Sequence, residues 1–117
     1  MSYMLLIIEP SGQRAERTEA EGRALYEGMM KFSEDLKSRG LLKVSQSLRS
    51  DESGVRVELR GGKRVTHDEP FVETKEIVGG YFLLDCETRE QAIEIAAACP
   101  AAEWATVEVR ELGPCFT

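Results

Sequence analysis

Apolar residues recur along the chain with two periods, and these periods predict where strands and helices lie. Tyr3 to Ile8 is apolar on both faces of a strand and ends before Pro10. Thr18 and Glu21 have the spacing of a capping box, so a helix is expected from about Glu19 to Arg39. The other expected elements are strands at Leu41 to Leu48, Val55 to Arg60, Lys63 to Thr66, Tyr81 to Asp85 and Trp104 to Arg110, and a helix running to about Ala98.

Glycine and capping residues mark the ends of these elements. Gly61-Gly62 separates two short alternating runs, which is typical of a tight β-hairpin. Thr88 and Gln91 have the spacing of a second capping box, at the start of the second helix. Gly79-Gly80 precedes an apolar run, where a glycine pair indicates a β-bulge or a close backbone approach.

The order of these elements predicts the fold class. It is strand–helix–strand, hairpin, strand–helix–strand, which favours an α+β ferredoxin-like sandwich with an extra β-hairpin. The length of 117 residues is that of one domain, so residues 1–117 are expected to form a single unit.

The two-faced apolar strands carry a further prediction. Helices on one face of such a sheet leave the second face open, although Met4 to Ile8 and Tyr81 to Leu84 are apolar on both faces. A second copy of the same sheet is the simplest cover, so we expect a homodimer whose sheets pack face to face.

Composition and charge exclude several classes of function. The net charge is −6 and the pI is near 4.9, which disfavours direct binding to nucleic acid. The best candidate for a local basic patch surrounds the Gly-Gly turn, where a solvated hairpin tip explains it better; its residues are Arg56, Arg60, Lys63 and Arg64. No apolar stretch approaches the roughly 20 residues that span a bilayer, and no signal peptide is recognised, so no membrane association is expected.

The cysteine pattern indicates a reducing compartment. Cys86, Cys99 and Cys115 are widely spaced and odd in number, which suits free thiols in the cytoplasm. With one histidine and no clustered thiols, a zinc site is not expected. An oxygen-rich set at His67, Asp68 and Glu69 is not distinctive for a metal either, and no cofactor is implied.

A motif from Thr66 to Asp85 resembles the signature of the DGPF branch of the YCII-related proteins. That signature is roughly V-T-D-G-P-F-x-E-T-K-E-x-x-G-G-Y-x-L-I-D, and the similarity extends over essentially the whole chain. The matching residues here are Asp68, Pro70, Phe71, Glu73, Thr74, Lys75, Glu76, Gly79, Gly80, Tyr81, Leu83 and Asp85. Two positions depart from it: Glu69 replaces a glycine of the signature, and His67 stands directly before Asp68.

The resemblance implies a dimeric α/β-barrel assembly of ferredoxin-like subunits and a small bacterial cytoplasmic protein of mostly unassigned biochemistry. Some relatives carry a transcription-initiation label, through association with extracytoplasmic-function sigma factors. More distant relatives include enzymes that act on small aromatic or lactone substrates in a cleft between sheet and helices.

The ionisable residues of this segment supply the candidate site. His67 and Asp68 are the candidate catalytic pair, because a histidine oriented by a carboxylate is a general base at neutral pH. The candidate ligand-binding residues are Glu73, Lys75, Tyr81 and Arg110. The alternative is structural: a proline-stiffened turn at Asp68, solvated charges at Glu73 and Lys75, and an Arg110 that pairs with Glu108.

Two functions are therefore open. In the first, the protein binds or converts a small aromatic or anionic molecule in a pocket beside the Thr66 to Glu76 loop, with Tyr3, Tyr81 and Trp104 as pocket aromatics or, alternatively, as core residues. In the second, it is a non-catalytic regulatory or interaction module associated with a sigma factor.

Overall fold

The structure is a computed structural model that describes residues 2–67 and 75–117. Its strands are β1 (Ser2–Pro10), β2 (Leu42–Ser47), β3 (Arg56–Arg60), β4 (Lys63–His67), β5 (Glu76–Asp85) and β6 (Thr106–Glu111). Its helices are α1 (Glu19–Ser38) and α2 (Arg89–Ala98), with single 3₁₀ turns at Gln13–Glu16, Asp51–Ser53 and Pro100–Glu103.

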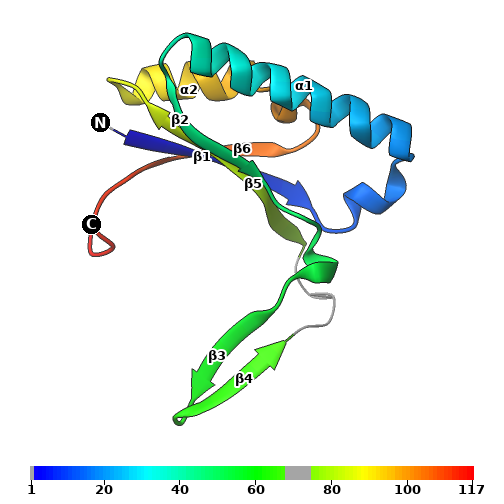
Figure 1. Ribbon diagram of the computed structural model, residues 1–117. Helices are drawn as coiled ribbons and strands as arrows, with labels where there is room; N and C mark the ends of the chain where they lie inside the picture. Colours follow the sequence, from blue (N-terminus) through cyan, green and yellow to red (C-terminus); the bar gives the residue numbers. More distant parts are fainter. Residues whose placement is uncertain (1, 68–74) are drawn as a thin grey trace.

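In the described part of the chain, β2, β5, β1 and β6 form an antiparallel sheet in that order, with β1 and β5 at its centre. Both helices lie on the same face of this sheet, and the β3–β4 hairpin stands away from it as a separate arm (Figure 1). The predicted α+β ferredoxin-like sandwich with an extra hairpin is therefore confirmed at the level of one chain.

Several boundaries differ from the sequence prediction. Strand β5 begins at Glu76, not at Tyr81, so the glycine pair lies inside the strand, and β6 begins at Thr106 because a 3₁₀ turn follows Pro100. The capping box at Thr18 is complete, with both reciprocal bonds. At Thr88 the side chain accepts from the N–H of Gln91, but the Gln91 amide oxygen accepts from the N–H of Glu87, so the second capping box is only half formed.

The core lies between the helices and the sheet. Alternate residues of β1 point into it, and Leu5 and Ile7 are buried against Phe82 of β5. Phe82 also packs edge-on against Phe32 of α1, with ring centroids 5.4 Å apart. Leu36 of α1 is fully buried as well, so this face of the helix packs toward the sheet.

The other residues of β1 form the open face of the sheet. Met4, Leu6 and Ile8 are only half-buried, and they lie in register with Leu83, Tyr81 and Val78 of β5. In a single chain, the described residues place no helix over this face (Figure 1). The strands are apolar on both faces, as predicted, but one chain buries only one of them.

The β3–β4 arm is exposed over almost its whole length. Gly61 and Gly62 have φ angles of 57° and 79°, the left-handed conformation that a tight hairpin turn requires. The arm accounts for a radius of gyration of 16.0 Å, against about 13 Å for a compact domain of this size.

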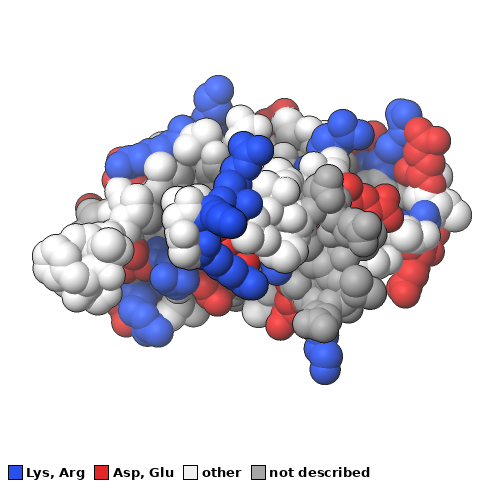
Figure 2. All heavy atoms as spheres, turned by 90° about the horizontal axis from the view of Figure 1, so that it is seen from below, with Lys and Arg blue, Asp and Glu red and all other residues white. Residues whose placement is uncertain are grey.

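Seen from below, Lys and Arg side chains gather in a band across the middle of the molecule (Figure 2). Arg60, one residue of the predicted basic patch, pairs with Glu58 at 2.9 Å.

Among the described residues, no helix has both the length and the apolar character needed to cross a bilayer.

The burial of the cysteines gives a test of this core. Cys86 and Cys99 are buried, and burial raises the pKa of both thiols, whereas Cys115 is exposed. Because thiolates are the reactive species, we expect one thiol per chain to react rapidly with Ellman's reagent in the native protein and three in denaturant. Cys115→Ser should remove the rapid phase. Rapid reaction of a second thiol in that variant would contradict the burial described here.

Candidate functional site

A cleft of about 640 Å³ lies between α1 and the sheet. Its volume is within the range of about 300–1,000 Å³ that small-molecule sites occupy. Strands β1, β2 and β5 supply one wall and α1 the other. The apolar side chains that line it include Ile7, Leu25, Tyr26, Met29, Met30 and Phe82.

A buried carboxylate, Glu9, lies at one end of this cleft. Strand alternation puts Glu9 on the helix-facing side of β1, after Tyr3, Leu5 and Ile7. Its side chain is therefore carried into the protein, and the residue is only 2% exposed. A charged group in this position needs a compensating partner, because burial of an unpaired charge is strongly unfavourable.

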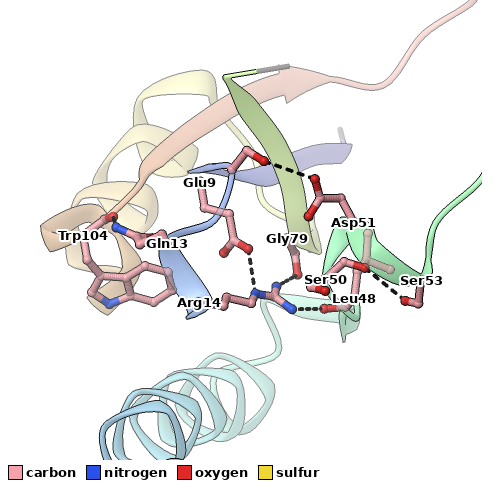
Figure 3. Close-up of polar contacts among 10 residues, drawn as sticks. Glu9, Gln13, Arg14, Leu48, Ser50, Asp51, Ser53, Gly79 and Trp104 are labelled. Atoms are coloured by element: carbon pink, nitrogen blue, oxygen red, sulfur yellow. Dashed lines mark hydrogen bonds and ion pairs between the residues drawn. The ribbon is translucent and has the colours of Figure 1, made fainter. Parts of the chain in front are cut away.

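Arg14 is that partner. Its Nε lies 2.6 Å from Oε1 of Glu9, while its Nη1 donates to the carbonyl of Leu48 at 2.6 Å and its Nη2 to the carbonyl of Gly79 at 3.1 Å (Figure 3). Arg14 belongs to the 3₁₀ turn Gln13–Glu16 that follows β1. Gly12, which has a φ angle of 85°, directly precedes this turn. Two backbone carbonyls, one directly after β2 and one within β5, thus fix the guanidinium beside the carboxylate.

The geometry at Glu9 leaves one oxygen without an aligned donor. The contact between Arg14 Nε and Oε1 is short, but it is an ion pair and not an aligned hydrogen bond, and no described residue donates a hydrogen bond to Oε1. Buried polar atoms are almost always hydrogen-bonded. Oε1 is enclosed by protein atoms and is not open to the cleft, so the short ion pair with Arg14 is what offsets its charge.

Gly79 makes room for the pair. The register of β1 and β5 shifts between Ile7 and Ile8, which leaves Gly79 as the extra residue of a β-bulge. A Cβ atom at Gly79 would lie 2.5 Å from Oε2 of Glu9 and 2.9 Å from Nη2 of Arg14. The bulge expected at Gly79-Gly80 is therefore present. Gly80 also makes the close approach, since its Cβ would lie 2.9 Å from the backbone oxygen of Gln46.

The rim of the cleft carries arginines. The guanidinium of Arg17 lies 4.8 Å from the ring centroid of Trp104, a cation–π contact. Arg23 pairs with Glu19 at 2.7 Å on the exposed first turns of α1. All four residues line the cleft, so its opening is polar while its walls are apolar.

The predicted catalytic pair is not part of this cleft as far as it is described. His67 ends β4, where its Nε2 lies 3.3 Å from Oε2 of Glu58, and its side chain is 51% exposed. Asp68 and Glu73 lie outside the described residues. Lys75 is exposed, and its carbonyl accepts a hydrogen bond from the N–H of Ser11. The catalytic role of His67 and Asp68 stays a prediction.

The remaining predicted ligand-binding residues lie on the sheet. Tyr81 borders the cleft as part of β5, although its register with Leu6 puts it on the open face. Arg110 is on the open face too, in register with Met4, and its Nη1 lies 3.2 Å from Oε2 of Glu108.

The pocket aromatics that the sequence suggested separate into two roles. Tyr3 is buried in the core, and Trp104 lines the cleft.

Sequence reasoning missed Glu9 and Arg14. The available signal was the alternation of β1, which continues past Ile7 and puts Glu9 on the buried face. Among the described residues, no three His, Cys, Asp or Glu side chains are grouped closely enough to hold a metal ion.

These features define a class: a ferredoxin-like α+β protein with a cleft between its sheet and its longer helix, and a buried ion pair at one end of that cleft. The chain matches the family model of the YCII-related domain over residues 1–115, and it therefore belongs to the YCII-related family. A search of curated proteins found no match.

The contact at Gly79 gives a test of the site. Gly79→Ala introduces a methyl group into the Glu9–Arg14 pair, and we expect it to lower the free energy of unfolding by about 1–3 kcal/mol, as overpacking does. Gly28→Ala in α1 is the control, because a Cβ there meets nothing within 4 Å and alanine favours the helix by about 0.5–1 kcal/mol. Urea denaturation measures both. Equal stability of the two variants would contradict the described packing around Glu9.

Proposed function

We propose that the protein binds a small organic molecule in the cleft between α1 and the sheet. The observation that carries this proposal is the cleft of about 640 Å³, whose apolar walls meet the buried Glu9–Arg14 ion pair at one end. Apolar walls with a few fixed polar groups are the usual composition of small-molecule sites. The family resemblance supports the same region, since distant relatives use a cleft between sheet and helices.

Binding would use the two kinds of surface differently. The apolar side chains of α1 and β5 would remove the body of the ligand from water, a gain of about 25 cal/mol per Å² of buried apolar surface. The polar groups that line the cleft, Arg17 and Gln46 among them, would orient the ligand, and the Glu9–Arg14 pair would hold the wall in place through the two carbonyl contacts of Arg14. Conversion of the ligand by His67 and Asp68 is a separate hypothesis, which the Glu9–Arg14 site does not require.

Two glycines of α1 allow a matched test. Gly22 lines the cleft and Gly28 does not, and a Cβ at either one meets nothing within 4 Å. We expect Gly22→Leu to fill part of the cleft and abolish binding of small aromatic and anionic fragments, detected by saturation-transfer NMR, while Gly28→Leu retains it. Circular dichroism checks that both variants stay folded. Fragments that bind both variants equally would place the binding site elsewhere, and a wild-type protein that binds none would refute the proposal.

We also propose that the protein is a homodimer that packs the open faces of two sheets together. Met4, Leu6 and Ile8 on β1 and Leu83 on β5 form an apolar strip on that face, and the exposed Val44 of β2 and Val78 of β5 extend it. A second copy would cover this strip by two-fold symmetry. The dimeric α/β-barrel assembly implied by the resemblance supports this arrangement.

A charge on the open face tests the dimer. We expect Leu6→Glu to halve the mass measured by light scattering at micromolar concentration, because a buried carboxylate between the sheets would lack a partner. Ile93→Glu is the control, since Ile93 is exposed on α2, away from the open face. A wild-type protein of monomeric mass would refute the dimer. A folded Leu6→Glu variant that keeps the dimeric mass would refute the packing of the two open faces.

We also propose that the chain belongs to the DGPF branch and lies in the cytoplasm. The motif from Thr66 to Asp85 supports assignment to the DGPF branch, and three free cysteines support a cytoplasmic location. Association with a sigma factor, as a non-catalytic module, rests on the family resemblance alone and stays the alternative.

A further inference from the structure

The β3–β4 arm has an apolar face that one chain leaves in water. Val55, directly before β3, and Val57 and Leu59 within it are all exposed, and Leu59 is 74% exposed. Alternate residues of a strand point to the same face, so the three side chains form one apolar row along the arm. Single exposed apolar residues are common on protein surfaces, whereas a contiguous row marks an interaction surface.

The opposite face of the arm is charged, and its ion pairs close within the arm. Oε2 of Glu58 lies 2.9 Å from Nη2 of Arg60 and 3.3 Å from Nε2 of His67. A hairpin of only two strands is marginally stable in water, and packing of one face against another surface stabilises it. The apolar row is therefore the face of the arm that calls for a cover.

The charge of the arm indicates the kind of surface that covers it. Residues 55–67 carry a net charge of +3 from four basic side chains and one acidic one, whereas the whole chain carries −6, so the body of the protein outside the arm carries −9. Surfaces of opposite charge attract each other and like charges repel. The arm therefore complements the body of another copy and repels a second arm.

The position of the arm agrees with this partner. The arm projects on the side of the sheet opposite to the helices, where the open face lies (Figure 1). The five residues of β3 span about 17 Å at roughly 3.3 Å per residue, while packed sheets lie about 10 Å apart. The arm is thus long enough to pass alongside the sheet of a copy packed on the open face.

The base of the arm and the open face border the same hollow. This hollow has a volume of about 450 Å³, and its lining includes Ile8 and Val78 of the open face together with Arg56 of the arm. A copy that covers the open face would therefore also meet the arm.

Two other partners fit the arm less well. A hairpin that inserts into a lipid surface needs an apolar tip, whereas Arg60 and Lys63 flank the turn of this arm and its apolar residues lie along the side. Nucleic acid is bound mainly through contacts of basic side chains with phosphates, which gives no role to the apolar row.

We propose that the arm of each copy packs its apolar face against the acidic body of the other copy in the dimer. The arms are exchanged reciprocally by the two-fold symmetry, and each one adds a second contact to the packed open faces. This inference rests on the proposed dimer, and it adds the surface that holds the two copies together at their sides.

A matched pair of valine variants tests the apolar face. We expect Val57→Ser to raise the dissociation constant of the dimer, measured by sedimentation, about fivefold or more, and added Leu59→Ser to extend the rise to about tenfold or more. Val65→Ser is the control, because Val65 is in register with Glu58 and lies on the charged face of the same arm. It should change the dissociation constant by less than about twofold. Circular dichroism checks that all variants stay folded.

Two measurements locate the contact. The amides of β3 and β4 should exchange hydrogen about tenfold more slowly in the wild-type dimer than in the Leu6→Glu monomer, because docking restricts opening of the arm. Lys63 is the one lysine of the arm, and a carbodiimide should link it to a carboxylate in the body of the partner. Mixed dimers of isotope-labelled and unlabelled chains identify the links between copies by mass spectrometry.

The outcomes separate the arm contact from the dimer itself. If the Val57→Ser, Leu59→Ser variant dimerises as tightly as the wild-type protein, or the arm exchanges equally fast in dimer and monomer, the arm contact is wrong while the face-to-face dimer stands. Links between Lys63 and the arm of the partner, or protection of the arm that requires anionic vesicles or duplex DNA, would overturn it too. If the wild-type protein is monomeric, the proposed dimer fails together with this inference.

Discussion

The buried ion pair between Glu9 and Arg14 is the constraint on which the cleft depends. Strand β1 carries Glu9 into the protein on the same face as its apolar residues, where an unpaired carboxylate would be strongly unfavourable. Arg14 meets this requirement and at the same time binds the carbonyls of Leu48 and Gly79. One side chain thus joins the end of β1, the segment after β2 and the start of β5. Losing one partner of a buried pair costs about 3–5 kcal/mol, and because the Arg14 side chain is 31% exposed we expect the lower end here.

The glycine pair of the family motif has a physical role in this arrangement. Gly79 is the unpaired residue of a bulge, and its missing side chain leaves the space that the Glu9 carboxylate occupies. Gly80 lets β2 approach β5 closely. A segment that the sequence presents as a strand boundary is therefore part of the wall of the candidate site, and its residues act through the backbone and not through side-chain chemistry.

The two faces of the sheet present different surfaces. The helix-facing side holds the core and, toward one end, the cleft, while the open side presents an apolar strip in a single chain. Because strand alternation assigns neighbouring residues to opposite faces, Glu9 belongs to the cleft and Ile8 to the open face. Ligand binding and self-association would then use different residues of the same strand, which is why substitutions at Gly22 and Leu6 can test them independently.

Local pattern determined most of the fold. Alternation, helical spacing, the cap at Thr18 and the turn at Gly61-Gly62 predict elements that depend on neighbours in sequence, and those elements are present with boundary shifts of a few residues. The candidate site could not be found in this way. The single histidine and the acids around it drew the prediction to residues 66–76, whereas the described cleft joins Glu9 and Arg14 near the start of the chain to Gly79 and Trp104 far along it. By itself the sequence determined the elements, their order and the family, because these follow from local spacing and a continuous motif. Only the tertiary structure decided which arginine pairs with the buried Glu9 carboxylate and which strands line the cleft, because those partners meet through strand register and the packing of α1 across the sheet.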